Sequence, residues 1–344
     1  MELQAVLVGC GLMSRRWLEA AARIEGLTIT GLVDIDPSRA RSRADEFGLM
    51  HSTVGSDLDA VLSTTKPQLV FDIVVPDARY DIVRTAFAHG CHVLSEKPMA
   101  ASLADAQSLI HASRESGRIH AVVQNRRYIE GIRRIRSFLD SGDIGAVTSV
   151  HSDFFLGPHF GGFRETMENV LLLDMAIHTF DAARYIIGRQ PQAVYCHETN
   201  PKDSWYAHGA SAYAIFEFEE GVTYTYRGSW CAQGLRTSWE SAWRVIGERG
   251  TLTWDGYDTF NAEREIETGG LLRDAELIPV PPLAQDARIG GHEGVIREFV
   301  DAVRTGATPE TVNYENIKSL AMVIAAIESA KTRQRVPVAS GEIP

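Results

Sequence analysis

The stretch Leu3-Gln4-Ala5-Val6-Leu7-Val8-Gly9-Cys10-Gly11 decides the fold. Its first six residues are almost entirely apolar, which is typical of a short strand buried on both faces of a parallel sheet. Two glycines then mark a tight turn, and residues 14–24 have the pattern of a helix. A second strand, residues 28–33, ends at Asp34. A strand, a glycine turn, a helix, a strand and a terminal acid together form a dinucleotide-binding fingerprint.

Each part of this unit has a physical role toward a dinucleotide. Gly9 allows the tight turn, and Gly11 lets backbone N–H groups approach a pyrophosphate at the N-terminus of the helix. Asp34 is expected to accept hydrogen bonds from the ribose hydroxyls of the adenosine half. A carboxylate there repels a 2′-phosphate, so NAD is favoured over NADP. The nearby Arg39 and Arg41 leave NADP open.

Strands and helices continue to alternate up to about residue 123. We expect further strands at 69–75, 93–95 and 120–123, and helices at 36–48, 57–63, 80–89 and 103–116. This alternation of strands and helices predicts an α/β fold with a doubly wound parallel sheet in an N-terminal domain, residues 1–123. The pattern then changes, with helices expected at 129–141, 169–187, 294–304 and 314–333. Strands are expected at 146–155, 210–218, 222–230, 239–246 and 251–254, in a strand-rich region that reaches about residue 280. Residues 124–344 are therefore predicted to form an α+β domain with a large, mostly antiparallel open sheet.

The composition narrows the class of protein. The chain has 344 residues, enough for two domains with substantial cores. A net charge of −11 argues against nucleic acid or an anionic membrane as the main partner. The four cysteines are scattered without a Cys-x-x-Cys pair, and no apolar run approaches the ~20 residues of a membrane span. These features predict a cytoplasmic protein.

A charged pair, Glu96 and Lys97, follows the expected strand 93–95. Pro98 removes the backbone N–H that would continue the ladder, so the pair is predicted at the carboxyl edge of the sheet. Ligands bind at that edge in open α/β sheets. An isolated Glu-Lys-Pro is more often the solvated start of a loop, but the fingerprint upstream favours a site.

Asp174 and His178 are four residues apart, so on a helix they share one face. Histidine is the usual base for removing a hydroxyl proton while hydride leaves the carbon. Asp174 would orient or charge-stabilise the imidazole or bind a substrate hydroxyl, and Lys97 would stabilise negative charge on the reacting oxygen. A buried polar pair is the alternative for this spacing. A metal site needs a third ligand, and none stands at a recognisable spacing, so no metal is predicted.

Several stretches together resemble the Gfo/Idh/MocA family of glucose–fructose oxidoreductases, inositol dehydrogenases and relatives. They are the Gly-x-Gly unit and residues 72–76 (DIVVP), 90–98 (GCHVLSEKP), 124–127 (QNRR), 174–181 (DMAIHTFD) and 334–338 (QRVPV). The resemblance implies a Rossmann domain followed by a domain with a large open sheet. It implies hydride transfer between a nicotinamide and a sugar, cyclitol or similar polyol, with Lys97, Asp174 and His178 as catalytic residues. It also suggests a cis peptide bond between Lys97 and Pro98.

The expected contacts follow from this resemblance and the fingerprint. Cofactor binding is expected from Gly9, Gly11, Leu12, Met13, Asp34, Pro76, Glu96, Lys97 and Gln124. Substrate binding is expected from Lys97, Asp174 and His178, and from His159 and Arg164 in the loop where relatives hold substrate. For His159 a surface position in that loop is an even alternative. Trp230, Trp239 and Trp243 would stack on sugars or, more often for a sheet, belong to the core or an interface.

Some positions depart from the family pattern. Residues 168–170 replace a frequent glycine run, and Ala176 and Tyr80 stand where glycine and histidine are common in relatives. These departures reshape the pocket, so no single relative's substrate is carried over. NAD-dependent glycoside hydrolysis by transient oxidation and elimination stays open, as does a ligand-sensing regulator, against which the presence of Lys97 argues. The aromatic content of residues 210–254 predicts a homodimer or homotetramer through the C-terminal sheet.

Overall fold

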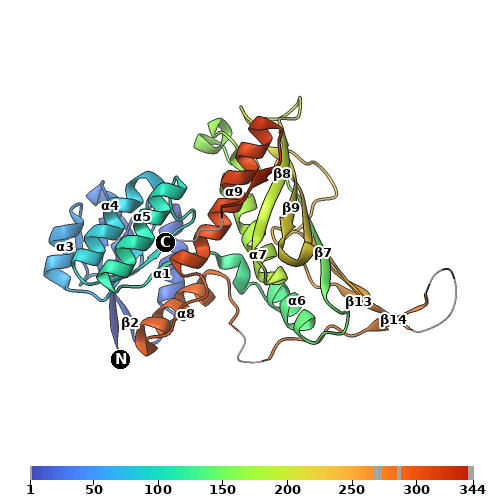
Figure 1. Ribbon diagram of the computed structural model, residues 1–344. Coiled ribbons are helices and arrows are strands. Elements are labelled where there is room, and N and C mark those ends of the chain that lie inside the picture. Colours follow the sequence, from blue (N-terminus) through green and yellow to red (C-terminus); the bar gives the residue numbers. More distant parts are fainter. Residues whose placement is uncertain (1, 267–270, 272, 285–287, 340–344) are drawn as a thin grey trace. The chain divides into compact units, whose positions relative to one another are not determined.

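The computed structural model describes residues 2–266, 271, 273–284 and 288–339 (Figure 1). These residues form two compact units. The first contains residues 2–128 and 288–317, and the second contains residues 129–284 and 318–339 of the described chain. The inclusion of residues 288–317 in the first unit was not expected from sequence. The domain boundary between residues 123 and 124 stays a prediction.

The first unit contains a parallel sheet of six strands in the order β3-β2-β1-β4-β5-β6. Its order reverses at β1, so the carboxyl ends of β1 and β4 flank the switch point at which open α/β sheets bind ligands. The predicted doubly wound sheet is thereby confirmed, and the short β3 is an addition. The strands are β1 (Leu3–Val8), β2 (Leu27–Val33), β3 (Thr53–Gly55), β4 (Leu69–Asp72), β5 (His92–Ser95) and β6 (His120–Val122).

Helices cover both faces of this sheet. Helices α3, α4 and α5 pack in a row on one face, while α1 packs against α8 around a core that includes Trp17, Leu18 and Phe299 (Figure 1). Side-chain caps start several of them, as where Asp36 accepts from the Ser38 amide at 3.0 Å. The helices are α1 (Leu12–Ala21), α2 (Pro37–Glu46), α3 (Leu58–Thr65), α4 (Pro76–Ala88), α5 (Leu103–Ser116) and α8 (His292–Thr305), with a 3₁₀ turn at Asn125–Tyr128.

The second unit contains a sheet of nine strands in the order β14-β13-β12-β11-β7-β10-β9-β8-β15. Every neighbouring pair is antiparallel except β7 and β10. The predicted large, mostly antiparallel sheet is confirmed. The strands are β7 (Val147–Phe155), β8 (Pro191–Thr199), β9 (Ser211–Phe218), β10 (Thr223–Ser229), β11 (Ala242–Gly247), β12 (Gly250–Trp254), β13 (Phe260–Glu265), β14 (Ala275–Ile278) and β15 (Val336–Pro337).

One face of this sheet is buried and the other is open, because buried and exposed residues alternate along strands such as β9. On the buried face, Phe180 of α7 (Ile177–Ile187) contacts Phe216 and Tyr224 edge to face. Helices α6 (Glu130–Asp140) and α9 (Asn313–Thr332) lie beside α7 in Figure 1. On the open face, Tyr195 and Ile215 are neighbours in the β8–β9 register and are each about half exposed.

The helix predicted at residues 169–187 is present but is not α-helical throughout. It begins as a π-helix, Leu171–Ala176, and continues as α7. Asn169, just before it, has a positive φ of 49° and donates through Nδ2 to the Glu198 carboxylate of β8. Glu198, which is distant in sequence, therefore binds the residue just before the π-helix, and that residue has a positive φ that lies outside the α-helical region.

Two predicted strands also differ in length. The strand predicted at 69–75 stops at Asp72, because the chain turns to begin α4 at Pro76. The strand predicted from Trp239 begins only at Ala242, because Ser241 has a φ of 68° and leaves the extended conformation.

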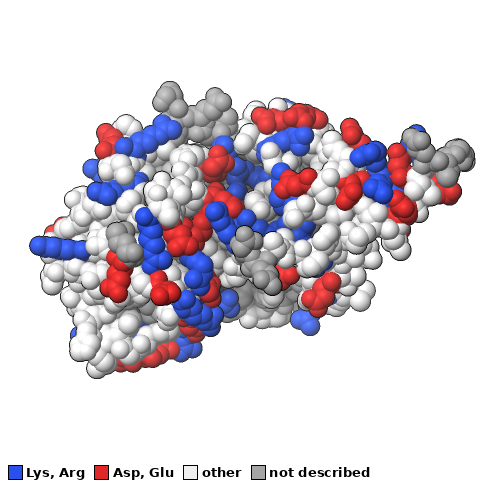
Figure 2. Space-filling view, turned by 90° about the horizontal axis from the view of Figure 1, so that it is seen from below, with Lys and Arg blue, Asp and Glu red and all other residues white. Residues whose placement is uncertain are grey.

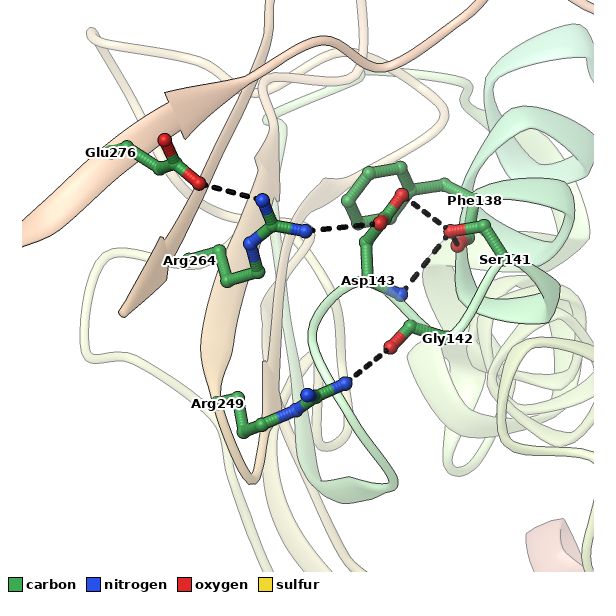
Figure 3. Close-up of polar contacts among 7 residues, drawn as sticks. All are labelled: Phe138, Ser141, Gly142, Asp143, Arg249, Arg264 and Glu276. Carbon is green, nitrogen blue, oxygen red and sulfur yellow. Dashed lines mark hydrogen bonds and ion pairs between the residues drawn. The ribbon is translucent and has the colours of Figure 1, made fainter. Parts of the chain in front are cut away.

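Polar contacts at one end of the second sheet join the turn after α6 to the outer strands (Figure 3). Arg264 of β13 contacts Asp143 in that turn at 3.4 Å and Glu276 of β14 at 2.6 Å. Arg249 donates to the Gly142 carbonyl at 3.1 Å. The side chains of Arg264, Asp143 and Glu276 are partly exposed, so each ion pair contributes little to stability.

Acidic and basic side chains are interspersed on the face of the molecule drawn in Figure 2. Among the described residues, no helix has the length and apolar character that crossing a membrane requires.

Candidate active site

The glycine turn after β1 is built for close approach of a ligand. Gly9 has a φ of 94°, and a Cβ there would lie 2.8 Å from the Ile73 carbonyl, so only glycine fits. Gly11 caps α1, and a Cβ there would meet nothing within 4 Å. Leu12, in the first turn of α1, is 93% exposed, and Met13 is partly exposed. The N-terminus of α1 is therefore open on the side where a pyrophosphate would bind.

Asp34, directly after β2, is buried and fixed by the backbone. Its Oδ2 accepts from the Cys10 amide at 2.7 Å, and its Oδ1 accepts from the Asp36 amide at 3.0 Å. These bonds join the carboxylate to the glycine turn after β1. The following Ile35 is 95% exposed and leaves an apolar surface next to the carboxylate.

The turn after β5 is held by buried groups. The Glu96 amide donates to the Asp72 carbonyl at 2.8 Å, and Trp17 Nε1 donates to Glu96 Oε1 at 2.8 Å. Glu96 Oε2 accepts from the Lys97 amide at 3.2 Å. The Lys97–Pro98 bond is cis, which confirms the expectation.

A histidine from the distant α8 completes the surroundings of Glu96. Nε2 of His292 lies 3.8 Å from Glu96 Oε1, and its Nδ1 lies 3.2 Å from Asn125 Nδ2. Burial by itself raises the pKa of the Glu96 carboxyl, but the nearby His292, the Trp17 bond and the Lys97 charge outweigh it and hold the pKa low. The carboxylate thus points at Trp17 and His292, two residues for which the sequence offered no signal, and its expected contact with the cofactor stays a prediction.

Two further expected cofactor residues lie at the carboxyl ends of strands. Pro76 is the first residue of α4. Gln124 follows β6 and is fully buried, yet neither atom of its side-chain amide has a hydrogen-bond partner in the described part of the chain. Buried amides are normally paired, so this one fits a site that a polar ligand completes. Together with the opening at Gly11, the residues present fit a dinucleotide.

In the second unit, Asp174 lies in the π-helix and His178 in the first turn of α7. Arg164, from the 3₁₀ turn Gly162–Thr166, donates through Nε to Asp174 Oδ2 at 2.6 Å. Its guanidinium also lies over the rings of Phe160 and Phe163, at 5.1 and 4.8 Å from their centroids. The loop before the π-helix thus contacts Asp174 directly.

An aromatic cluster supports the same loop. His159 stacks on Trp205 with centroids 3.7 Å apart, and Pro158 O accepts from Trp205 Nε1 at 3.1 Å and from Tyr206 at 2.9 Å. His159 is exposed, as the surface alternative expects, and it is stacked on Trp205.

The three tryptophans considered from sequence have different surroundings. Trp243 is buried and stacks with Tyr224, and Trp230 is buried against Phe160, which favours a core role for both. Trp239 is 43% exposed.

The expected residues thus fall in two groups. Those expected to bind the cofactor, with Lys97, lie in the first unit, and Asp174, His178, His159 and Arg164 lie in the second. Within the described residues, no three His, Cys, Asp or Glu side chains are grouped as metal ligands would be.

Comparisons with known proteins agree with this architecture. Residues 3–124 match the model of an oxidoreductase family with an NAD-binding Rossmann fold, and residues 132–253 match the model of the GFO/IDH/MocA C-terminal domain. The chain is 28% identical over 351 residues to a D-apiose dehydrogenase from Paraburkholderia graminis, covering 98% of this chain and 90% of the relative. It is 23% identical over 349 residues to an inositol 2-dehydrogenase from Burkholderia vietnamiensis, covering 100% and 98%.

A solved structure shares the fold. It is an oxidoreductase from Agrobacterium radiobacter in complex with NAD+, L-tartaric acid and magnesium, with a TM-score of 0.86 and 23% identity over 98% of this chain and 99% of that one. The two family models lie in sequence order and together match most of the chain. The chain therefore belongs to the GFO/IDH/MocA family of NAD-binding oxidoreductases.

Proposed function

We propose that this oxidoreductase transfers hydride between NAD(H) and a secondary alcohol of a sugar, cyclitol or similar polyol. Its similarity to proteins named for a sugar and for a cyclitol supports this substrate class. The observation that carries the proposal is the anchored turn after β5. There Trp17 holds Glu96, and Lys97 follows at the edge of the sheet where such folds bind ligands.

Oxidation of a secondary alcohol removes the hydroxyl proton and a hydride from one carbon. NAD+, when bound, supplies the hydride acceptor. We assign removal of the hydroxyl proton to His178 and stabilisation of negative charge on the reacting oxygen to Lys97. Asp174 orients the imidazole or binds a neighbouring hydroxyl, and its bond to Arg164 limits the positions that the carboxylate takes. In the reverse direction the histidine returns the proton.

For the cofactor we propose NAD rather than NADP. The Asp34 carboxylate is buried at the end of β2, where it would accept from ribose hydroxyls and repel a 2′-phosphate. Of the cations nearby, Arg39 lies 3.5 Å from Asp36, and Arg43 donates to the Gly11 carbonyl at 3.1 Å. Arg41, the other cation considered from sequence, is exposed, so a comparison of NADH and NADPH affinities tests this proposal directly.

We further propose that residues 1–123 bind the cofactor and residues 124–344 the substrate, with His159 and Arg164 among the substrate contacts. The open face of the second sheet is proposed to join subunits into a homodimer or homotetramer, since Tyr195, Tyr213 and Ile215 are half exposed there. Light scattering after size exclusion tests this, with Ile215→Asp as the disrupting variant. A monomeric wild type at micromolar concentration would overturn it.

The activity is tested in two steps. A thermal-shift screen of sugars and cyclitols with NAD+ identifies ligands, because binding raises apparent stability by mass action. NADH formation is then followed by absorbance for the wild type, Lys97→Met, His178→Ala and the control Lys66→Met, an exposed lysine of the same unit. We expect Lys97→Met to lower kcat severely and His178→Ala to lower the rate about 10²–10⁴-fold. Near-full turnover in Lys97→Met would refute the assignment.

A further inference from the structure

Helix α4 carries a fully buried arginine, Arg79. A buried guanidinium requires both a counter-charge and hydrogen-bond acceptors. Its Nε donates to Asp72 Oδ2 at 2.7 Å, and that carboxylate is also fully buried. The two other nitrogens donate to backbone carbonyls, Nη2 to Val74 O at 2.5 Å and Nη1 to Pro98 O. Each nitrogen of the guanidinium therefore has an acceptor.

The three partners lie in two neighbouring turns at the carboxyl edge of the sheet. Asp72 ends β4 and Val74 follows in the turn to α4, while Pro98 follows β5. Asp72 also accepts from the Val74 amide at 3.1 Å through Oδ1 and from the Glu96 amide at 2.8 Å through its carbonyl. The turn after β4 also lies against Gly9, because a Cβ at Gly9 would be 2.8 Å from the Ile73 carbonyl of that turn. Arg79 thus links the turn after β4, which lies beside the glycine turn, to the turn after β5, which contains Lys97.

We propose that Arg79 is a positioning residue for Lys97, an inference that rests on the proposed role of Lys97 in hydride transfer. Proline has no N–H, so Pro98 can be held through its backbone only by its carbonyl, and Arg79 supplies the donor. The residue before Lys97 is held as well, by the bond of Trp17 to Glu96. Because both neighbours are bound to buried groups, the backbone of Lys97 is held in one conformation. This fixes the position from which the side chain extends to its ammonium.

The geometry also indicates why the residue is an arginine. A carboxylate and two carbonyls from different turns are reached at once by the fork of a guanidinium. A lysine would retain the charge beside Asp72 but has a single nitrogen. We therefore expect Arg79→Lys to keep the ion pair and to lose the contact with Pro98 or Val74.

A buried ion pair also stabilises the fold, so the test separates folding from positioning. Arg79→Gln leaves the buried Asp72 charge without its partner and is expected to lower the unfolding midpoint. In the double variant Asp72→Asn/Arg79→Gln no unpaired charge remains, so much of the decrease in the unfolding midpoint is expected to be recovered. The guanidinium that holds Pro98 is still missing. Arg84→Gln on the same helix is the control, because Arg84 is exposed and contacts only Tyr80 among the described side chains.

Two readouts are compared with the unfolding midpoint. In the double variant we expect kcat to fall at least about tenfold while KM for NAD+ changes by less than about threefold, because a displacement of ~1 Å at a reacting group costs rate rather than binding. Hydrogen–deuterium exchange of a peptide covering residues 94–102 should also become faster. Arg84→Gln should change neither readout.

The outcomes distinguish this inference from the proposed function. Unchanged exchange at residues 94–102, or full kcat in a folded double variant, overturns the role of Arg79. If wild-type protein oxidises no polyol with NAD+, the proposed function fails, and the exchange measurement alone then decides whether Arg79 holds the turn.

Discussion

Replacing Glu198 by glutamine should change how stability depends on pH. Glu198 lies on β8, and its Oε2 accepts from Asn169, which begins the segment that contains Asp174. Its other oxygen, Oε1, is buried and has no partner in the described part of the chain. Burial raises the pKa of this carboxyl from its ordinary 4.5 to about 6, against the lowering effect of the Asn169 bond.

The magnitude follows from that difference. An interval of about 1.5 pH units, at 1.36 kcal/mol per unit, corresponds to about 2 kcal/mol, and partial exposure to solvent reduces this to about 1 kcal/mol. The folded state binds the Glu198 proton more tightly than the unfolded state does. The loss of stability caused by the buried charge is therefore absent below about pH 4.5, grows up to about pH 6 and is complete above it. Glutamine carries no such penalty, and its amide oxygen still accepts from Asn169.

The assay is urea unfolding of the wild type and Glu198→Gln at several values between pH 5 and 7.5. We expect the variant to gain about 1 kcal/mol relative to the wild type across this range. The control is Glu217→Gln on the neighbouring β9, where the hydrogen bond from Arg335 lowers the pKa of the carboxyl. The Glu217 carboxylate stabilises the fold at pH values above its unfolded pKa, so replacing it should lower the free energy of unfolding rather than raise it. A stability difference for Glu198→Gln that is independent of pH would refute the reasoning.

Three further predictions concern the cofactor and the core. Fluorescence titration should show tighter binding of NADH than of NADPH, because the buried Asp34 repels a 2′-phosphate, and the reverse order would contradict the cofactor proposal. Trp17→Phe removes the donor to the buried Glu96 carboxylate and should cost about 1.5–3 kcal/mol in urea unfolding, whereas an unchanged midpoint would show that another donor replaces it. Gly131→Ala places a Cβ in collision with the ring of Trp254 and should destabilise by about 1–3 kcal/mol, which Trp254→Leu should partly relieve if the clash is the cause.

Short-range patterns were sufficient for much of the fold. The apolar run before Gly9, the glycine turn and the acid at Asp34 lie within one local unit, and each acts through backbone geometry and burial that neighbours in sequence determine. The end of the strand before Pro98 could be predicted for the same reason, since a missing N–H is a property of one residue. Alternation of apolar residues also predicted the large antiparallel sheet of the second unit.

The polar contacts that hold these elements required the tertiary structure. Glu96 is held by Trp17, 79 residues away in sequence, and by His292 from α8. The π-helix that contains Asp174 follows an Asn169 fixed by Glu198, 29 residues further along the chain. Nothing in the local sequence distinguishes these residues from solvated ones. The sequence by itself determined which residues end the strands at the ligand-binding edge, and tertiary packing decided which distant donors satisfy the charges buried there, because the cost of an unpaired buried charge arises only when the chain is folded.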